Sequence, residues 1–359
     1  MKTLCIGILA YNEEDSIENT IRSVFEQSIL HAKNQHDEGF AIELVVVPNG
    51  CKDRTAELAS KAMTKELADK EINPNLTAKA CELAEPGKEN AWNHYIHEFS
   101  SPDSDFYILI DADIRLEHPE VLYNLVDCLI SNPQADVSSG SPIKHIQQKP
   151  RKSILDHLSI GATRLRWGMK GTLAGCLYCG RGEVLRSFRL PTVLMGEDSF
   201  IRAMIVTKGF TQKDDPSLIV NARNATVVFE AYTSPSEIIR NKTRRMFEST
   251  INAILYTKLW ADSTPQTPAG DLIKLWDAHD SSWSHTLINE EFELRGFWKI
   301  PKFFMYKQFL QLRHHRWPKR LRLLPVALAT LPLNTLAVYR ANKIADRGDI
   351  RKLWDKASS

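Results

Sequence analysis

The sequence Phe106-Tyr107-Ile108-Leu109-Ile110-Asp111-Ala112-Asp113 joins a short apolar run directly to two acidic residues. An apolar run of this length predicts a strand that is buried on both faces of a sheet. Two carboxylates at its end repel each other unless a cation lies between them. Mg²⁺ and Mn²⁺ prefer oxygen ligands and are commonly held by one or two carboxylates together with substrate phosphates. We therefore expect Asp111 and Asp113 to bind one of these metals. The alternative is a solvated turn, because three-residue motifs recur by chance.

Strands and helices alternate on both sides of this stretch. Apolar runs at 4–10 and 42–47 predict two more buried strands, and 79–83 predicts another. Asn12 offers a cap for a first helix, and Asp53 opens a second. The alternation predicts an α/β fold of Rossmann-like type, with a mainly parallel central sheet and flanking helices.

Polar residues follow three of the predicted strands. They are Tyr11-Asn12-Glu13, Pro48-Asn49-Gly50 and Asp111-Ala112-Asp113. In open α/β sheets, ligands bind beyond the carboxyl ends of the strands. We therefore expect all three stretches to face one crevice.

Three further motifs suit an anionic ligand or an acceptor. Gly196-Glu197-Asp198 precedes a helical pattern, so a carboxylate there is either a general base or a residue that favours the helix start. The stretch 240–245 places Arg240 and Arg244 on one helix face, which either binds diphosphate oxygens or is an exposed basic face. Gly87-Lys88 enters another helix, where Lys88 could reach a phosphate.

Taken together, the order and spacing of these motifs resemble the family 2 glycosyltransferases, which are inverting enzymes with the GT-A fold. The resemblance covers roughly residues 3–250, and we expect a C-terminal helical extension in addition to this GT-A fold. It rests on Tyr11-Asn12-Glu13, the turn at 45–55, Gly87-Lys88 with Ala91 and Asn93, Asp111-Ala112-Asp113, the stretch from Gly175-Cys176 to Arg181, Gly196-Glu197-Asp198 and the segment 240–245. Two departures stand out: Asn49 replaces the Asp of many relatives, and Met246 replaces the Trp usual in membrane synthases, which argues against a processive synthase.

The resemblance implies a role for each candidate residue. Asp198 would be the catalytic base, and Glu197 would help to orient the acceptor. Asp113 would bind Mg²⁺ or Mn²⁺, and Asp111 would hold the ribose or the sugar close to the metal. The remaining residues would bind the nucleotide sugar, the first five near the nucleoside and the last three at phosphate: Tyr11, Asn12, Glu13, Asn49, Asp53, Lys88, Arg244 and Arg245.

The implied reaction is transfer of a hexosyl-type sugar from a nucleotide sugar to an acceptor hydroxyl. UDP is the nucleotide that the resemblance favours, while GDP and dTDP remain open. The acceptor would be a glycan or a lipid-linked molecule in polysaccharide, glycolipid or cell-envelope glycan synthesis. The alternatives are a sugar-phosphate nucleotidyltransferase and a non-catalytic sugar-nucleotide-binding homologue. The first needs a Gly-rich loop where Tyr11-Asn12-Glu13-Glu14 stands, and the intact Asp113 and Asp198 argue against the second.

The C-terminal part is basic and partly apolar. The formal net charge of the chain is only +2, yet 295–352 contains many basic residues and two acids, Asp346 and Asp349. The apolar run 323–339 is interrupted by Pro325 and Pro332 and is flanked by Lys and Arg. This pattern predicts peripheral membrane contact through 297–343. The alternative is a helix that packs on the catalytic domain.

The 359 residues suggest two domains. We expect a catalytic domain at 1–232, with a nucleotide-sugar half at 1–115 and an acceptor half at 136–232. A helical extension at 233–359 would follow, with an insertion at 258–295. No signal peptide precedes the first strand, so we expect a cytoplasmic protein, peripheral on the cytoplasmic face of the inner membrane. We expect no nucleic acid among the partners.

Overall fold

The computed structural model describes residues 2–31, 39–69, 71–147, 170–230, 235–312 and 317–347. The chain divides into two compact units. The first comprises Met1–Thr192, Glu197–Ala231 and Leu259–His279, and the second comprises Val193–Gly196, Tyr232–Lys258 and Asp280–Ser359. The first unit contains the sheet and the second is helical, which confirms the predicted fold class.

An eight-stranded sheet forms the centre of the first unit, in the order β3-β2-β1-β4-β7-β6-β8-β5. Its strands are β1 (Lys2–Ala10), β2 (Phe40–Pro48), β3 (Leu76–Ala80), β4 (Phe106–Asp111), β5 (Ile114–Leu116), β6 (Val137–Lys144), β7 (Leu177–Arg181) and β8 (Ile219–Phe229). Neighbouring strands from β3 to β4 are parallel, as are β6 and β8. β7 runs against β4 and β6, and β5 runs against β8. The sheet is therefore mixed, with two strands reversed in a mainly parallel arrangement.

The register brings the carboxyl ends of β1, β2 and β4 to one edge. Leu9 of β1 pairs with Asp111 of β4, and Ala10 pairs with Pro48 of β2. The polar loops that follow these strands are therefore neighbours, because parallel strands in this register end together.

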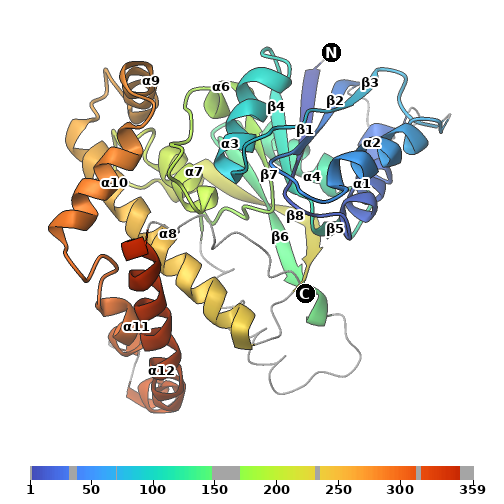
Figure 1. Cartoon of the computed structure of the whole chain (residues 1–359). Coiled ribbons are helices and arrows are strands. Elements are labelled where there is room, and N and C mark those ends of the chain that lie inside the picture. The colour runs from blue at the N-terminus through green and yellow to red at the C-terminus, as the bar shows by residue number, and fades with distance from the viewer. Residues whose placement is uncertain are drawn as a thin grey trace. The chain divides into compact units, whose positions relative to one another are not determined.

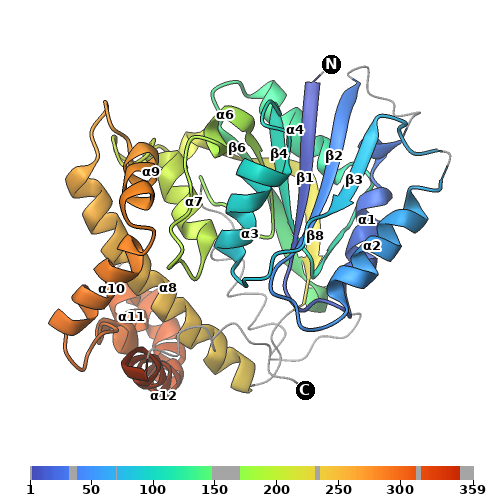
Figure 2. The same ribbon diagram turned by 45° about the horizontal axis from the view of Figure 1, so that its top comes forward.

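Helices cover both faces of the sheet (Figures 1 and 2). α1 (Ile17–Phe25), α2 (Thr55–Glu66) and α4 (Val121–Ser131) share one core with alternate residues of β1. α3 (Lys88–His94) and the π-helical turn Tyr95–Phe99 lie on the opposite face. There Gly7 leaves room for Tyr95, because a Cβ on Gly7 would lie 2.5 Å from the Tyr95 ring. This close approach holds α3 firmly over β1 and so fixes where Lys88 begins the helix.

Some elements differ from the sequence predictions. Asn12 does not cap α1: its backbone has φ +51°, and the helix begins at Ile17. The reason is that the Asn12 side chain accepts a hydrogen bond from the backbone N–H of Lys52 instead. β3 lies at Leu76–Ala80 rather than at 79–83.

The stretch 258–295, expected to be an insertion or linker, is mostly helical. It contains the end of α8 (Pro235–Asp262), then α9 (Ala269–His279) and α10 (Trp283–Leu294). In the first unit, Ala269 and Ile273 of α9 are fully buried. The Ser-, Thr- and Pro-rich composition therefore marks the turns between these helices.

The second unit is built from most of α8, from α10 and from α11 (Phe303–Leu312) and α12 (Trp317–Arg347). Within the described residues, Leu323–Arg347 of α12 is long and apolar enough to cross a membrane by length and composition, and 25% of its most apolar window is buried. Pro325 and Pro332 lie inside this helix.

α12 turns its small and polar residues inward and its leucines outward. Ala337 and Ala341 are fully buried, and Asn334 accepts a hydrogen bond of 2.8 Å from Lys242 of α8. In contrast, Leu321 is 54% exposed and Leu328 is 55% exposed. A helix that packs on a soluble core shows the reverse pattern, with its large apolar residues inside.

Glu43 of β2 joins four segments of the first unit. One carboxylate oxygen lies 2.7 Å from the Lys79 ammonium of β3, and the other accepts hydrogen bonds from the Ser101 backbone N–H at 2.8 Å and the Cys5 thiol at 3.2 Å. Burial alone would raise the pKa of Glu43, but the bonds from Lys79 and Ser101 outweigh it and lower that pKa. A carboxyl whose pKa is lowered by folding stabilises the folded chain above its ordinary pKa of 4.5 and loses that effect as the pH falls.

We therefore predict that Glu43→Gln lowers the free energy of unfolding at pH 7 by about 1–3 kcal/mol, since charge-assisted hydrogen bonds are lost. Urea unfolding at pH 7 and pH 4 measures the effect. The difference between the native chain and the variant should shrink at pH 4. Exposed Glu82→Gln is the control and should change stability by less than about 0.5 kcal/mol. A difference that is the same at both pH values would contradict the role given to the Glu43 charge.

Candidate active site

Lys88 forms two short ion pairs at the carboxyl edge of the sheet. Its ammonium lies 2.6 Å from Oδ1 of Asp111, the last residue of β4, and 2.7 Å from Oε1 of Glu197, the first residue of α7 (Glu197–Val206). The Glu197 residue is only 6% exposed, while about a quarter of the Lys88 and Asp111 side chains is exposed. The ion pairs therefore join three motifs that are far apart in the sequence.

The charges of this cluster act strongly on one another. Burial raises the pKa of Asp111, and the nearby Asp113 and Asp198 add to the rise, whereas Lys88 opposes it. The pKa of Glu197 is raised for the same reason, by burial first and by Asp198 and Asp111 as well. Burial would lower the pKa of Lys88, but its two carboxylate partners outweigh burial and raise that pKa. Lys88 is therefore held in its charged form, and the cluster favours a cation.

Asp198 follows Glu197 on α7 and packs against Gly175. A Cβ on Gly175 would lie 2.7 Å from Cβ and 3.4 Å from Oδ2 of Asp198, so only glycine leaves room for this side chain. The next residue, Cys176, accepts a hydrogen bond of 3.0 Å from the backbone N–H of Asp111. Asp198 and Asp111 therefore both contact the short segment that leads into β7.

Asp113 lies in the turn between β4 and β5 and is exposed. Among the described residues, no three His, Cys, Asp or Glu side chains are grouped so as to hold a metal ion by themselves. Two carboxylates without a third protein ligand do not make a structural metal site. They fit Mg²⁺ or Mn²⁺ whose other ligands come from a bound phosphate or from water. The donor set at Asp111 and Asp113 thus fits a metal that arrives with a phosphorylated substrate.

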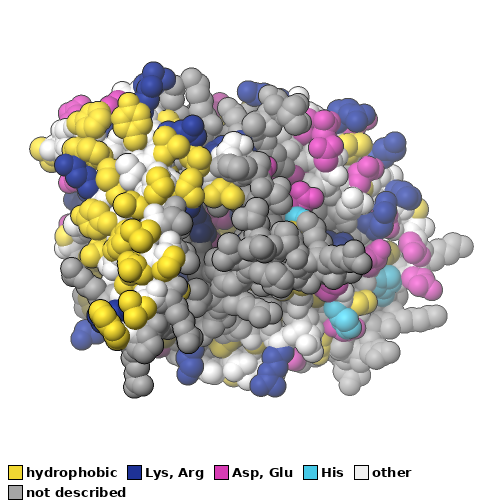
Figure 3. Space-filling model, turned by 90° about the horizontal axis from the view of Figure 1, so that it is seen from below, with side chains coloured by type: hydrophobic (Ala, Val, Ile, Leu, Met, Phe, Trp, Pro, Cys, Tyr) yellow, Lys and Arg dark blue, Asp and Glu magenta, His cyan; other side chains and the backbone are white. Residues whose placement is uncertain are grey.

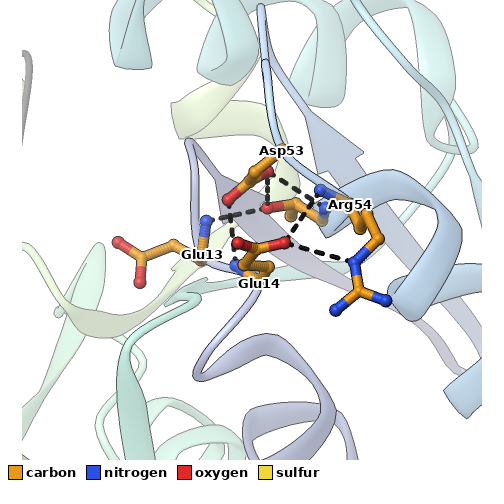
Figure 4. A network of polar contacts seen from close by, with 5 residues as sticks. Glu13, Glu14, Asp53 and Arg54 are labelled. Carbon is orange, nitrogen blue, oxygen red and sulfur yellow. Dashed lines mark hydrogen bonds and ion pairs between the residues drawn. The ribbon is translucent and has the colours of Figure 1, made fainter. Parts of the chain in front are cut away.

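The loops after β1 and β2 are held together by Asp53 (Figure 4). One Asp53 oxygen accepts hydrogen bonds from the Thr55 backbone and hydroxyl, and the other accepts one of 3.2 Å from the Glu14 backbone N–H. The Thr55 hydroxyl in turn accepts a bond of 2.8 Å from the Glu13 backbone N–H. Arg54 pairs with Glu14, with 3.4 Å between Nε and Oε2. The Asp53 carboxylate is used to shape these loops, and the Glu13 carboxylate points away from it.

Asn49 has a similar structural task. It is buried, and its amide donates a 2.7 Å bond to the Ala10 carbonyl and accepts a 3.1 Å bond from the Gly87 backbone N–H. The neighbouring Gly50 has φ +61°, and a Cβ there would lie 2.6 Å from the backbone of Pro86. Asn49 therefore fixes the entry to α3, immediately before Lys88.

The structure brings some of the predicted site residues together at this edge. Ion pairs join Lys88 to Asp111 and to Glu197 there. Asp113 and Asp198 lie close enough to Asp111 to raise its pKa. Tyr11 is half-buried in the loop after β1. Arg244 and Arg245 lie on α8 in the second unit, and their contact with phosphate stays a prediction.

Two features of the site were not predicted from the sequence. The first is the ion pair between Lys88 and Glu197, because the two residues were assigned to phosphate and acceptor separately. The second is the contact between Gly175 and Asp198, for which a glycine before an apolar strand gives only a weak signal.

The chain is similar to known proteins in sequence and in fold. The model of glycosyl transferase family 2 matches residues 5–183. A mannosyltransferase from Pyrobaculum calidifontis, solved in complex with GDP-Man and Mn²⁺, is similar in structure with a TM-score of 0.51 and 18% identity, over 98% of this chain and 87% of that one. This likeness shows a shared fold. Glucosyl-3-phosphoglycerate synthase from Mycobacterium tuberculosis, solved with Mg²⁺ and uridine diphosphate, reaches a TM-score of 0.44 at 18% identity, over 69% of this chain and 77% of that one.

Among curated proteins, no significant match to the sequence is found. The family match spans β1 to β7 and includes the tips of β1, β2 and β4, where the polar cluster lies. On this basis the chain belongs to glycosyl transferase family 2.

Proposed function

We propose that the chain is an inverting, metal-dependent glycosyltransferase that moves a sugar from a nucleoside diphosphate sugar to an acceptor hydroxyl. The observation that supports it best is the pair of contacts from Lys88 to Asp111 and Glu197, with Asp198 beside them. In this proposal Asp198 would act as the base, Lys88 would bind phosphate, and Asp111 and Asp113 would hold a metal, all from separate motifs near one sheet edge. These are the groups that such a transfer needs.

In the proposed reaction, Asp198 accepts the proton of the acceptor hydroxyl. The acceptor oxygen forms a bond to the anomeric carbon while the bond from that carbon to the diphosphate oxygen breaks. Attack opposite to the leaving group inverts the anomeric centre in one step. Lys88 stabilises the diphosphate as its negative charge grows. Glu197 holds the Lys88 ammonium and, through its acceptor-side position, helps to orient the acceptor.

Asp113 and Asp111 would hold Mg²⁺ or Mn²⁺. When bound, such an ion supplies positive charge that stabilises the departing diphosphate. Tyr11 and Glu13 would line the nucleoside pocket, whose loops Asp53 and Asn49 shape. We favour UDP as the nucleotide and keep GDP and dTDP as alternatives.

Two other functions remain to be tested against this one. A sugar-phosphate nucleotidyltransferase would release pyrophosphate, and the loop after β1 carries Glu13 and Glu14 where such an enzyme has glycines. A non-catalytic homologue would bind the nucleotide sugar without hydrolysing it. Slow, metal-dependent hydrolysis of the donor separates a transferase from both alternatives.

We also propose that the second unit binds a membrane surface through an outward face of α11 and α12. Figure 3 shows hydrophobic side chains gathered on one part of the molecular surface, with Lys and Arg at its margins. The exposed apolar residues of these helices are Phe303, Tyr306, Trp317, Leu321, Leu324, Leu328, Leu333, Leu336 and Tyr339. An apolar face with aromatic residues and basic margins suits the interface of an anionic membrane.

Cations and aromatic rings lie together near this face. The Lys302 ammonium lies 4.6 Å from the centre of the Trp298 ring, and the Lys307 ammonium lies 5.7 Å from that of Phe304. Long basic side chains can lie along apolar surface while their charges reach lipid headgroups. Such contact would place the enzyme at the cytoplasmic face of the inner membrane, next to a lipid-linked acceptor for glycolipid or cell-envelope glycan synthesis.

The first prediction concerns the base. Asp198→Asn should lower kcat by about a hundredfold to ten-thousandfold, because the acceptor proton loses its base, with donor affinity nearly unchanged. Nucleotide release in the presence of acceptor and donor binding by calorimetry measure the two effects. Exposed Asp271→Asn on α9 is the matched control and should behave like the native chain. Near-normal turnover by Asp198→Asn would rule out this base.

The second prediction concerns donor and metal. A panel of UDP-, GDP- and dTDP-sugars, GDP-Man included, should contain one that raises Tm by several degrees with Mn²⁺ present. A ligand at about 100 times its Kd adds about 2.7 kcal/mol of stability. Asp113→Asn should lose the part of the shift that depends on Mn²⁺. No shift with any donor, with or without Mn²⁺, would count against the proposed substrate class.

The third prediction concerns the membrane. The native chain should float with vesicles of phosphatidylcholine and phosphatidylserine. Leu321→Glu/Leu328→Glu should weaken binding at least about tenfold, because burial of one leucine contributes about 1.5–3 kcal/mol. Leu275→Glu on α9, which replaces a leucine that is 62% exposed, is the control and should still float. Equal flotation of all three proteins, or of none, would refute this membrane face.

A further inference from the structure

Lys88 occupies the carboxylate that the proposed metal would need. Its ammonium lies 2.6 Å from Oδ1 of Asp111, which is a full charge-assisted contact. A divalent metal binds a carboxylate oxygen at about 2.0–2.2 Å. An ammonium and a metal on the same small carboxylate would lie only a few ångströms apart and repel each other. Metal and Lys88 therefore compete for Asp111.

The ammonium is held from two fixed points. The backbone before Lys88 is fixed by Asn49, which accepts a hydrogen bond of 3.1 Å from Gly87. On the far side, Glu197 is buried at the start of α7, with its Oε1 at 2.7 Å from the ammonium. Between these points the lysine side chain is a flexible stem of four carbons. The ammonium can therefore leave Asp111 and stay in contact with Glu197.

A diphosphate would change the balance of this competition. It brings several anionic oxygens, so that Lys88 can turn from Asp111 to phosphate while the metal takes Asp111. The Lys88 ammonium and the metal then each have an anionic partner, and they no longer share the Asp111 carboxylate. Without the diphosphate, the metal can bind Asp111 only by breaking the ion pair between Lys88 and Asp111. The full free energy of that ion pair is then lost.

We propose that Lys88 guards Asp111, so that a divalent metal alone binds weakly and binds well only together with a nucleoside diphosphate. This inference rests on the proposed function, because it takes Asp111 to be part of a metal and diphosphate site. It adds an order of assembly: nucleotide and metal enter together, and the free enzyme does not carry the metal. Glu197 keeps Lys88 near the edge throughout.

The test measures Mn²⁺ binding without nucleotide, by the loss of the free Mn²⁺ signal in electron paramagnetic resonance. Lys88→Met/Glu197→Gln replaces the guarding pair by neutral groups of similar size, so that Glu197 is not left as an unpaired buried charge and Asp111 is free to take Mn²⁺. This variant should bind Mn²⁺ about tenfold more tightly than the native chain, or better, because no ammonium occupies Asp111. Adding Asp113→Asn to it should abolish the gain.

Lys79→Met is the control, because it removes another short ion pair between a lysine and a glutamate of the first unit. It should bind Mn²⁺ like the native chain. Melting curves and circular dichroism of each variant establish that it is folded. Equal Mn²⁺ affinity of the native chain and the double variant, including no measurable binding by either, would overturn the proposal. So would a gain that survives Asp113→Asn.

The outcome is independent of the transferase reaction, since no nucleotide or acceptor is present. If the protein binds no nucleotide sugar, the proposed function is refuted. The Mn²⁺ affinities of the native chain and the double variant can still be compared in that case. A protein that transfers sugar but whose double variant gains no Mn²⁺ affinity would refute only the guarding role of Lys88.

Discussion

A carboxylate at the end of a buried strand is unfavourable unless a positive charge compensates it, and at the tip of β4 Lys88 supplies that charge. The ion pairs of Lys88 join α3, β4 and α7. The surrounding features serve this contact: Tyr95 packs on Gly7 and holds α3 on the sheet, and Asn49 fixes the turn into α3. A cluster held in this way keeps charged groups ready for a ligand, whereas exposed pairs of the same type contribute little.

Much of this edge of the sheet could be predicted from the sequence, because a strand that is buried on both faces is a continuous apolar run. The apolar runs before Tyr11, Asn49 and Asp111 marked three strands correctly, and parallel pairing then required their ends to meet. What could not be predicted is which side chains touch. The pairing of Lys88 with Glu197 depends on how α3 and α7 pack, and no local pattern encodes it. Asn12 was misassigned for a related reason, since its side chain bonds to Lys52 on a neighbouring loop.

In the second unit, too, the sequence did not show which side chains are buried. The sequence marked 323–339 as apolar, but only the structure shows that α12 buries alanine and asparagine and exposes leucine. Composition did not reveal the two helices within 258–295, because serine, threonine and proline in the turns obscured them and tertiary packing stabilises them. Local propensity is a weak guide wherever packing decides the outcome. The proposed membrane face of α11 and α12 and the proposed diphosphate site would suit an acceptor held at a membrane surface.

The central claim is that the tips of β1, β2 and β4 bind a nucleoside diphosphate together with a divalent metal. A crystal structure with UDP and Mn²⁺, with the metal located by its anomalous scattering, tests it most directly. We expect one manganese peak bound by Asp113 or Asp111 and by diphosphate oxygens, with Lys88 turned from Asp111 to phosphate. Nucleotide and manganese bound elsewhere, or manganese at this edge without contact to either aspartate, would contradict the account.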